Sequence, residues 1–259
     1  MNNRLTRGAA TILALAACAC TADTPVPDAD ADRGSAETKA ASQTVIDQQA
    51  ALRESLPFDD RRDFEEHQRG FVAAPTYRRI TSESGETVWD IGQYDFLLSG
   101  EDIDSIHPSL QRQATLHMNY GLYEVVPDRI YQVRGYDLSN MTLIKGDTGW
   151  IIFDVLLVKE TAVAALAFAN EQLGERPVVA VVYSHSHADH FGGIRGVVDE
   201  ADVISGKVPI IAPRGFIENA IAENVYAGNA MTRRAAYQYG RVLPVSPYGQ
   251  IDSAIGKAT

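Results

Sequence analysis

The chain has 259 residues, 45% of them hydrophobic, and a formal net charge of −11. This balance suits a globular protein, and it makes nucleic acid or an anionic membrane surface a poor partner, because like charges repel. The two cysteines, Cys18 and Cys20, lie close together near the start, so no disulfide framework holds the body of the chain.

The first residues have the pattern of an export signal. Arg4 and Arg7 form a positively charged start, and the apolar run 9–17 is too short to span a bilayer. The Leu-Ala-Ala-Cys run that ends at Cys18 resembles a bacterial lipoprotein cleavage box. We therefore predict a signal peptide over residues 1–17 and a lipid on Cys18, with ordinary signal-peptidase cleavage as the alternative. The protein would be exported to the periplasmic side as an outer-membrane lipoprotein that touches the membrane only through its anchor.

Two segments precede the predicted domain. Residues 18–60 are rich in Ala, Asp, Thr, Ser and Gln, and they predict a flexible tether, because they bury too little apolar area to offset the entropy of ordering. Residues 44–56 within it have weak helical character. Residues 61–121 predict an N-terminal extension of loops and helices, with helical spacing over residues 107–118.

From residue 122 to residue 259 the pattern predicts an α/β domain. The expected strands are residues 123–126, 130–133, 141–145, 150–153, 178–183 and 209–212. The alanine-rich segment 159–173 predicts an amphipathic helix closed by Gly174. Gly192 and Gly193 are expected to allow a tight bend into a helix that continues over residues 195–199. Two more helices are expected at 215–225 and 230–239. A meander of strands followed by alternating helices and strands is typical of a sheet half covered by helices.

Four potential metal ligands follow the strand expected at residues 178–183, whose continuous apolar run is typical of a buried strand. His185 and His187 are two residues apart, so in an extended segment they point to the same side. Asp189 and His190 are adjacent, so a turn must bring them to the same point. Imidazole and carboxylate groups suit zinc and similar cations, and the sequence therefore predicts a metal centre here.

The H-x-H-x-D-H pattern after an apolar strand resembles the metallo-β-lactamase superfamily, which implies an αββα fold with metals between two β/α halves. Further blocks resemble the secreted alkyl sulfatases of that superfamily, from about residue 64 onward. These blocks are V-R-G-Y-D-L-S-N-M-T-L-I-K-G-D-T-G-W-I-I-F-D, E-R-P-V-V-A-V-V-Y-S-H-S-H-A-D-H-F-G-G, I-A-P-R-G-F and E-N-V-Y-A-G-N-A-M-T-R-R. One departure is Val155, where the family usually has proline.

The resemblance implies zinc-dependent hydrolysis of linear alkyl sulfate esters, such as dodecyl sulfate, to alcohol and sulfate by a metal-bound hydroxide. It implies two Zn²⁺ ions, one held by His185 and His187 and the other by Asp189 and His190, with Asp189 also catalytic. The aspartate that ends the preceding strand, Asp154, either positions this loop or caps a helix.

Three residues of the last block are candidates for binding the sulfate group. They are Asn229, Arg233 and Arg234, and a guanidinium can pair with two oxygens of an oxyanion. The alternative is a helix cap followed by an exposed basic pair.

The four ligands of the motif are too few for two zinc ions. No histidine follows His190, whereas the resemblance implies a later pair of glutamates, another histidine and two further domains. We therefore expect the N-terminal portion of a longer protein, with only the first half of the αββα domain. This portion would be poorly soluble and inactive alone, whereas the full-length protein would be a homodimer. Two alternatives stay open: a non-catalytic metal-binding surface lipoprotein, or another metallo-β-lactamase-fold hydrolase such as a lactamase or a thioesterase.

Overall fold

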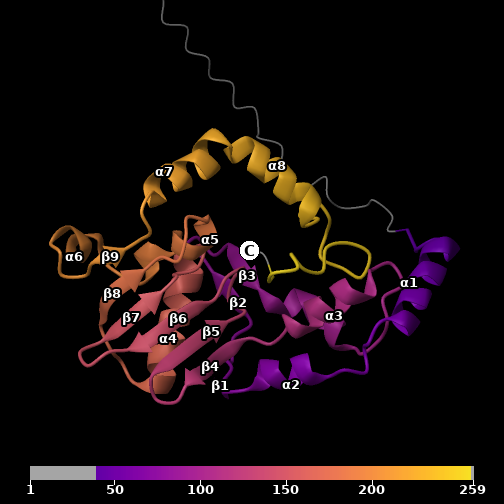
Figure 1. Cartoon of the computed structure of the whole chain (residues 1–259), viewed down its shortest axis with the longest axis horizontal. Coiled ribbons are helices and arrows are strands. Elements are labelled where there is room, and N and C mark those ends of the chain that lie inside the picture. Colours follow the sequence, from indigo (N-terminus) through magenta and orange to yellow (C-terminus); the bar gives the residue numbers. More distant parts are fainter. Residues whose placement is uncertain (1–38, 258–259) are drawn as a thin grey trace, which may run out of the picture. The chain divides into compact units, whose positions relative to one another are not determined.

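A sheet of seven strands carries the candidate site (Figure 1). The computed structural model describes residues 39–257, and all structural statements concern these residues. The order in the sheet is β1-β4-β5-β6-β7-β8-β9, and a separate hairpin pairs β2 with β3. The strands are β1 Phe71–Ala73, β2 Arg79–Thr81, β3 Thr87–Asp90, β4 Gly121–Val126, β5 Ile130–Arg134, β6 Met141–Lys145, β7 Trp150–Phe153, β8 Val178–Val182 and β9 Ile210–Ile211.

Strand directions decide where the loops meet. Neighbouring strands are antiparallel from β1 to β7, and β8 and β9 then run parallel to β7. Since β5 and β7 both run antiparallel to β6, the ends of β5, β7, β8 and β9 all reach one edge of the sheet. The predicted metal ligands follow β8, so this edge carries them.

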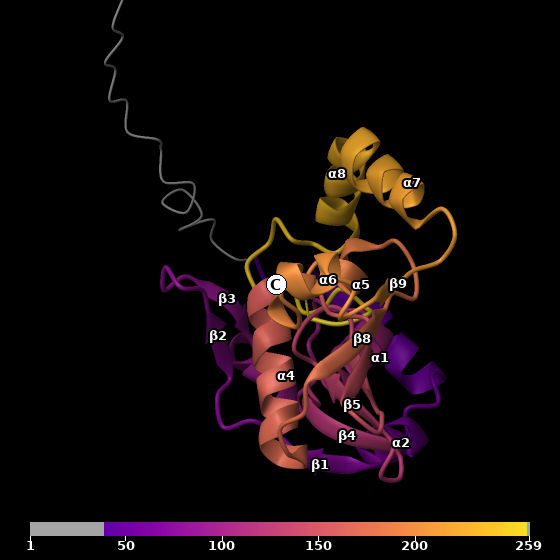
Figure 2. The ribbon, with the colours of Figure 1, turned by 90° about the vertical axis from the view of Figure 1, so that its left-hand side faces the viewer.

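Helix α4, Lys159–Leu173, connects β7 to β8 and has the bounds that the sequence predicts. Its buried residues recur every three or four positions, which is the spacing of one helix face. They are Thr161, Ala162, Ala165, Phe168 and Ala169. Gly174 follows with a φ of 90°, a conformation that favours glycine. Figure 2 shows α4 between the strands of the large sheet and the β2–β3 hairpin.

The segments before the sheet belong to the folded unit, which begins at Lys39. Their helices are α1 Gln43–Ser55, α2 Arg62–Gln68, the 3₁₀ helix η1 Ile91–Leu98 and α3 Pro108–Leu116. Arg53 of α1 donates hydrogen bonds to the Ile103 carbonyl and to Gln111, and it pairs with Asp102 at 2.8 Å. The tether predicted for residues 18–60 is therefore wrong for residues 39–60, because these contacts offset the cost of ordering them.

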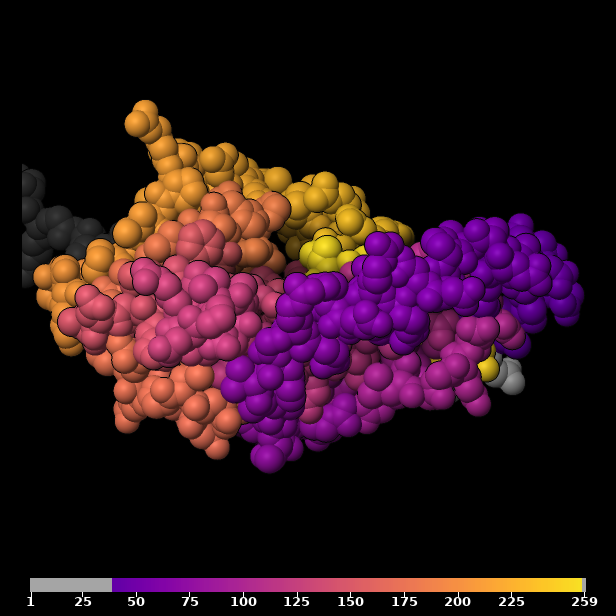
Figure 3. All heavy atoms as spheres, turned by 60° about the horizontal axis from the view of Figure 1, so that its bottom comes forward, coloured from indigo at the N-terminus to yellow at the C-terminus, as the bar shows by residue number. Residues whose placement is uncertain are grey.

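The boundary predicted between residues 121 and 122 does not separate two folded units. Strand β1 of the extension pairs with β4 of the sheet, with Phe71 opposite Tyr123. The last described residues also return to the extension, where Lys257 Nζ donates to the Ala114 carbonyl at 2.9 Å and pairs with buried Asp252 at 2.7 Å. Figure 3 shows atoms of the extension, in purple, against those of the strands, in magenta.

The segment after β8 packs less closely. Its helices are α5 Ala188–Phe191, the 3₁₀ helix η2 Ile194–Gly196, α6 Glu200–Ile204, α7 Phe216–Ile221, the π-helix η3 Ala222–Tyr226 and α8 Gly228–Gln238. We call residues 216–238 the helical arch, because Figures 1 and 2 both show it above α5. None of α7, η3 and α8 has a buried residue.

Two local predictions near the site are wrong. The run 178–183 is not fully buried, because only Val181 and Tyr183 are buried and the neighbouring β9 has just two residues to shield it. The helix expected at residues 195–199 is instead a 3₁₀ turn that ends at Gly196, followed by α6. Within residues 39–257, no helix is both long and apolar enough to cross a bilayer. The α/β class is confirmed.

Candidate metal centre

The metal loop, residues 184–193, leaves the end of β8 and turns into α5. Gly192 and Gly193 permit this path because the loop packs directly on the segment after β7. A side chain at Gly192 would collide with the Leu157 carbonyl oxygen, and one at Gly193 with that of Val155. The sequence predicts a flexible bend at these glycines, but close backbone approach is what requires them.

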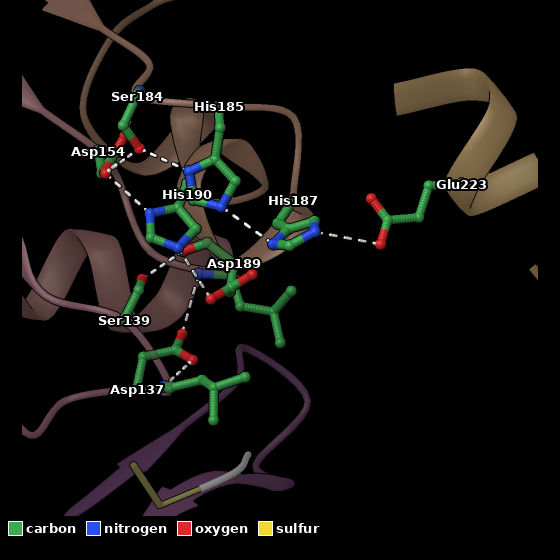
Figure 4. A network of polar contacts seen from close by, with 11 residues as sticks. Asp137, Ser139, Asp154, Ser184, His185, His187, Asp189, His190 and Glu223 are labelled. Atoms are coloured by element: carbon green, nitrogen blue, oxygen red, sulfur yellow. Dashed lines mark hydrogen bonds and ion pairs between the residues drawn. The ribbon is translucent and has the colours of Figure 1, made fainter. Parts of the chain in front are cut away.

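The four predicted ligands converge (Figure 4). The ring centroids of His185 and His187 are 4.6 Å apart, and those of His185 and His190 are 4.1 Å apart. His185 Nε2 lies 3.0 Å from His187 Nδ1. His190 Nε2 lies 3.1 Å from a carboxylate oxygen of Asp189. The turn formed by α5 therefore places Asp189 and His190 beside the two earlier histidines.

Asp154 and Ser184 hold the outer sides of these rings. Asp154 accepts a hydrogen bond from His190 Nδ1 at 2.8 Å, from the Ser184 amide at 2.8 Å and from the Ser184 hydroxyl at 2.7 Å. Because the Ser184 hydroxyl donates its single hydrogen to Asp154, it accepts from His185 Nδ1, 2.8 Å away. The Nε2 atoms of both histidines then face inward, as in metal-binding histidines.

These contacts decide between the two interpretations of Asp154. Helix α4 begins after Val158 and has no side-chain cap, so Asp154 supports the metal loop and does not cap the helix. Asp154 has a φ of 59°, the left-handed conformation that aspartate tolerates better than most residues. Ser184 lies in the same sequence block as the metal ligands, and no role was predicted for it from the sequence.

Burial and hydrogen bonds shift the pKa values of His190, Asp154 and Asp189 in opposite directions. Burial lowers the pKa of His190, but hydrogen bonds to Asp154 and Asp189 outweigh it and raise that pKa to about 9. Burial raises the pKa of Asp154 and of Asp189, and their bonds to His190 lower both below the ordinary value. Burial and the neighbouring His190 and His187 lower the pKa of His185, which favours a neutral ring with a free lone pair.

A second layer fixes the backbone of the metal loop. The Ser139 hydroxyl donates to the Asp189 carbonyl oxygen. Buried Asp137 accepts from the Leu157 amide at 3.0 Å and from the Thr161 hydroxyl at 2.9 Å. Burial raises the pKa of Asp137. The loop after β5 thus supports the metal loop, a contact that the sequence analysis did not predict.

Glu223 is a further residue that the sequence analysis did not single out. It comes from η3 of the helical arch, and its Oε1 lies 3.3 Å from His187 Nε2 (Figure 4). Its place in the E-N-V-Y-A-G-N-A-M-T-R-R block was the one available signal. This contact joins the helical arch to the metal loop.

The donor set suits a metal ion. Three imidazoles and a carboxylate are zinc ligands, and two of the imidazoles have their outer nitrogens held by hydrogen bonds. In residues 39–257, however, no three such side chains surround a common point as they do in an ion site. The donor atoms instead contact each other, as His185 does with His187. The residues fit a metal by their chemistry, and the structure provides no coordination geometry.

The other predicted site residues lie outside this cluster. Asn229, Arg233 and Arg234 are exposed on α8, and no hydrogen bond or ion pair found among the described residues joins them to the metal loop. Their sulfate contacts and the catalytic role of Asp189 stay predictions. Cys18 lies outside the described residues.

Comparison with known proteins identifies the fold. Residues 134–245 match the family model of the metallo-beta-lactamase superfamily. The structure of a stereoselective inverting sec-alkylsulfatase from Pseudomonas sp. superposes with a TM-score of 0.82 and 48% identity, over 87% of this chain and 35% of that one. Residues 134–245 therefore have the fold of part of a metallo-β-lactamase domain. The fold predicted from the sequence, a partial domain of this type, is confirmed.

Curated relatives of this chain are alkylsulfatases. A linear primary-alkylsulfatase and an (R)-specific secondary-alkylsulfatase, both from Pseudomonas sp., are 50% and 47% identical to it over 87% of its length. An alkyl/aryl-sulfatase of Saccharomyces cerevisiae is 44% identical over the same share. The chain spans about a third of the length of these relatives, 34% to 35%. The chain is therefore similar to one part of proteins named as sulfuric ester hydrolases.

Proposed function

We propose that this chain supplies the first half of the active site of a zinc-dependent hydrolase of linear alkyl sulfate esters. The observation that carries the proposal is the cluster of His185, His187, Asp189 and His190, in which Ser184 holds the ring of His185 and Asp154 holds the ring of His190. That arrangement occurs in a chain that is 47% and 50% identical to two alkylsulfatases.

Two metal positions suit these ligands. His185 and His187 would hold one zinc ion, and Asp189 and His190 would hold the other. When bound, zinc supplies Lewis acidity and lowers the pKa of water, so that hydrolysis can proceed at neutral pH.

The chain's own residues prepare and orient the ligands. Asp154 fixes the ring of His190 through Nδ1, so Nε2 is the atom that gives up its proton to bind metal. The ionised Asp189 offers a carboxylate beside it, available as a ligand or as a proton acceptor. Because the net charge is −11, local cations must attract a sulfate ester, and we propose Arg233 and Arg234 for this role.

The test uses the protein with all the sequence that its gene encodes. With zinc added, wild-type protein should release inorganic sulfate from dodecyl sulfate, and His187→Ala should reduce the rate at least about a hundredfold. His107→Ala, which changes an exposed histidine at the start of α3, should keep the wild-type rate. Zinc binding without sulfate release would favour the non-catalytic lipoprotein, and lactam or thioester hydrolysis would favour the other hydrolases.

We also propose export and lipidation at Cys18, from the charged start and the short apolar run of the sequence. Cys18→Ser should abolish incorporation of labelled palmitate, and equal labelling of mutant and wild type would contradict lipidation. A homodimer stays a prediction from the family resemblance, and light scattering on the purified protein would test it.

A further inference from the structure

A hollow lies among the helices α1, α2, η1 and α3, which precede most of the large sheet. It has a volume of about 310 Å³, at the lower end of the range of small-molecule sites. Its lining includes Arg53, Arg61 and Arg112, and we call it the arginine hollow. Figure 1 shows α1 and α3 on the right, away from α5, which carries part of the metal loop. The metal centre therefore does not account for this hollow.

Apolar side chains form much of the wall of the arginine hollow. The rings of Phe58 and Phe64 are half-buried. Leu97 is buried, whereas Leu98 is 58% exposed. A hydrocarbon group that covers Leu98 and the two rings removes apolar surface from water, and this favours its binding.

Two of the three arginines already have acidic partners. Arg53 pairs with Asp102 at 2.8 Å, and Arg112 pairs with Asp63 at 2.8 Å. Arg61 differs, because no hydrogen bond or ion pair engages its guanidinium within residues 39–257. The arginine hollow therefore offers one positive charge to a ligand.

The position of Arg61 joins this charge to the apolar wall. Its guanidinium carbon lies 3.8 Å from the centroid of the Phe64 ring. A guanidinium pairs through two N–H groups with the oxygens of a carboxylate or of a sulfur oxyanion. A ligand with an anionic head and a hydrocarbon body would therefore meet both kinds of group side by side.

A neighbouring hollow has the opposite charge. It has a volume of about 410 Å³, and its lining includes Glu101, Asp102 and Asp104. No arginine or lysine of the described residues lines it. An anion there would meet only like charges, so the arginine hollow is the one of the two that suits it.

We propose that the arginine hollow binds an amphiphilic monoanion. The carboxylate or sulfur oxyanion of this ligand pairs with Arg61, and its hydrocarbon body covers Phe64 and Leu98. The site is separate from the metal centre, and the inference does not depend on the proposed hydrolysis.

The test titrates octanoate and octanesulfonate, which cannot be hydrolysed as esters, into the full-length protein and measures Kd by calorimetry. Arg61→Gln should raise Kd about tenfold or more, because the charged donor is lost. Leu98→Asn should raise it about threefold or more, because an apolar contact is lost. Both side chains are exposed, so neither change should lower Tm. The matched control is Arg69→Gln, which removes the same charge from an exposed arginine at the end of α2, outside the hollow, and should keep the wild-type Kd.

Two further probes separate the charge from the hydrocarbon. Octan-1-ol lacks the charge and inorganic sulfate lacks the hydrocarbon, so each should bind at least about tenfold more weakly than octanesulfonate. Arg61-dependent binding of either anion supports the inference, and the tighter of the two identifies the head group.

Three results would overturn the inference. The first is a wild-type protein that binds neither anion, which would mean that the arginine hollow is closed to ligands. The second is an equal Kd in wild type and in Arg61→Gln. The third is a loss in Arg69→Gln as large as that in Arg61→Gln, because binding would then follow the net charge and not the hollow.

Discussion

The site lies between two regions that differ in how they are supported. In strands β5 to β7 the side chains of Val133, Met141, Leu143, Trp150 and Ile152 are fully buried. In the helical arch no residue is buried, and Val225 is 68% exposed. The sheet edge supplies the metal loop and its supports, whereas the arch supplies Glu223 and the predicted sulfate contacts. The metal ligands therefore depend on the packed core, and the contacts of the arch depend on few neighbours.

This difference separates two kinds of substitution. A change at the sheet edge should alter metal binding and stability together, because the same residues serve both. A change in the arch should alter how the substrate is handled and leave the fold intact.

Among the residues that support the metal ligands, the largest effect is expected at Asp154, which follows β7 and bonds to the metal loop. Asp154→Asn should lower zinc affinity about 10-fold to 100-fold and reduce sulfate release by at least as much, because His190 and Ser184 lose a charged acceptor. Competition with a chelator measures the affinity. Asp147→Asn, in an exposed turn, is the matched control and should behave as wild type. Unchanged affinity in Asp154→Asn would show that the support is dispensable.

The next prediction compares stability in the two regions. Leu143→Ala removes a fully buried side chain and should cost about 2–5 kcal/mol of the free energy of unfolding. Val225→Ala in the arch should change it by no more than about 0.5 kcal/mol. Urea unfolding of the same protein measures both. Equal costs would mean that the arch is packed as closely as the sheet.

The same division explains what the sequence could predict. Strands β6 and β7 and helix α4 have the expected bounds, because their patterns are local: Ala162, Ala165 and Ala169 repeat at helical spacing. The four metal ligands lie within six residues, so one motif was enough to place them together.

The features that the sequence did not predict depend on contacts between distant segments. Ser184 acts through Asp154, 30 residues earlier, and Glu223 reaches His187 across 36 residues. The order of α1 depends on Arg53 contacting residues about 50 positions later. No local periodicity reports such pairs, and the role of Asp154 stayed open for the same reason.

Zinc affinity at the sheet edge should depend on pH, because His190 is one of the ligands there. The pKa of His190 is raised to about 9 in the metal-free protein, so zinc must displace a proton below that pH. Zinc affinity should therefore rise with pH up to about 9, by up to about tenfold per pH unit. Because the pKa is raised on folding, the stability from this ion pair is present below about 6.5 and is lost as pH rises through about 9. Calorimetric titrations at several pH values would check the affinity, and a flat profile would contradict the pairing.

The smallest effect is expected at Glu223. Glu223→Gln removes the charge of a side chain that is 3.3 Å from His187 and keeps its size. Sulfate release should fall about threefold to tenfold with no change in the free energy of unfolding, because Glu223 assists the ring from the arch. Glu175→Gln, at an exposed position between α4 and β8, is the matched control. A loss as large as that of Asp154→Asn would place Glu223 among the main supports.

The most direct test is the metal content of the purified full-length protein. We predict about two zinc ions per chain in wild type and at least one fewer in His187→Ala, measured by mass spectrometry of the digested protein. His107→Ala should keep the wild-type content. Unchanged zinc in His187→Ala would remove this histidine from the metal centre and contradict the account.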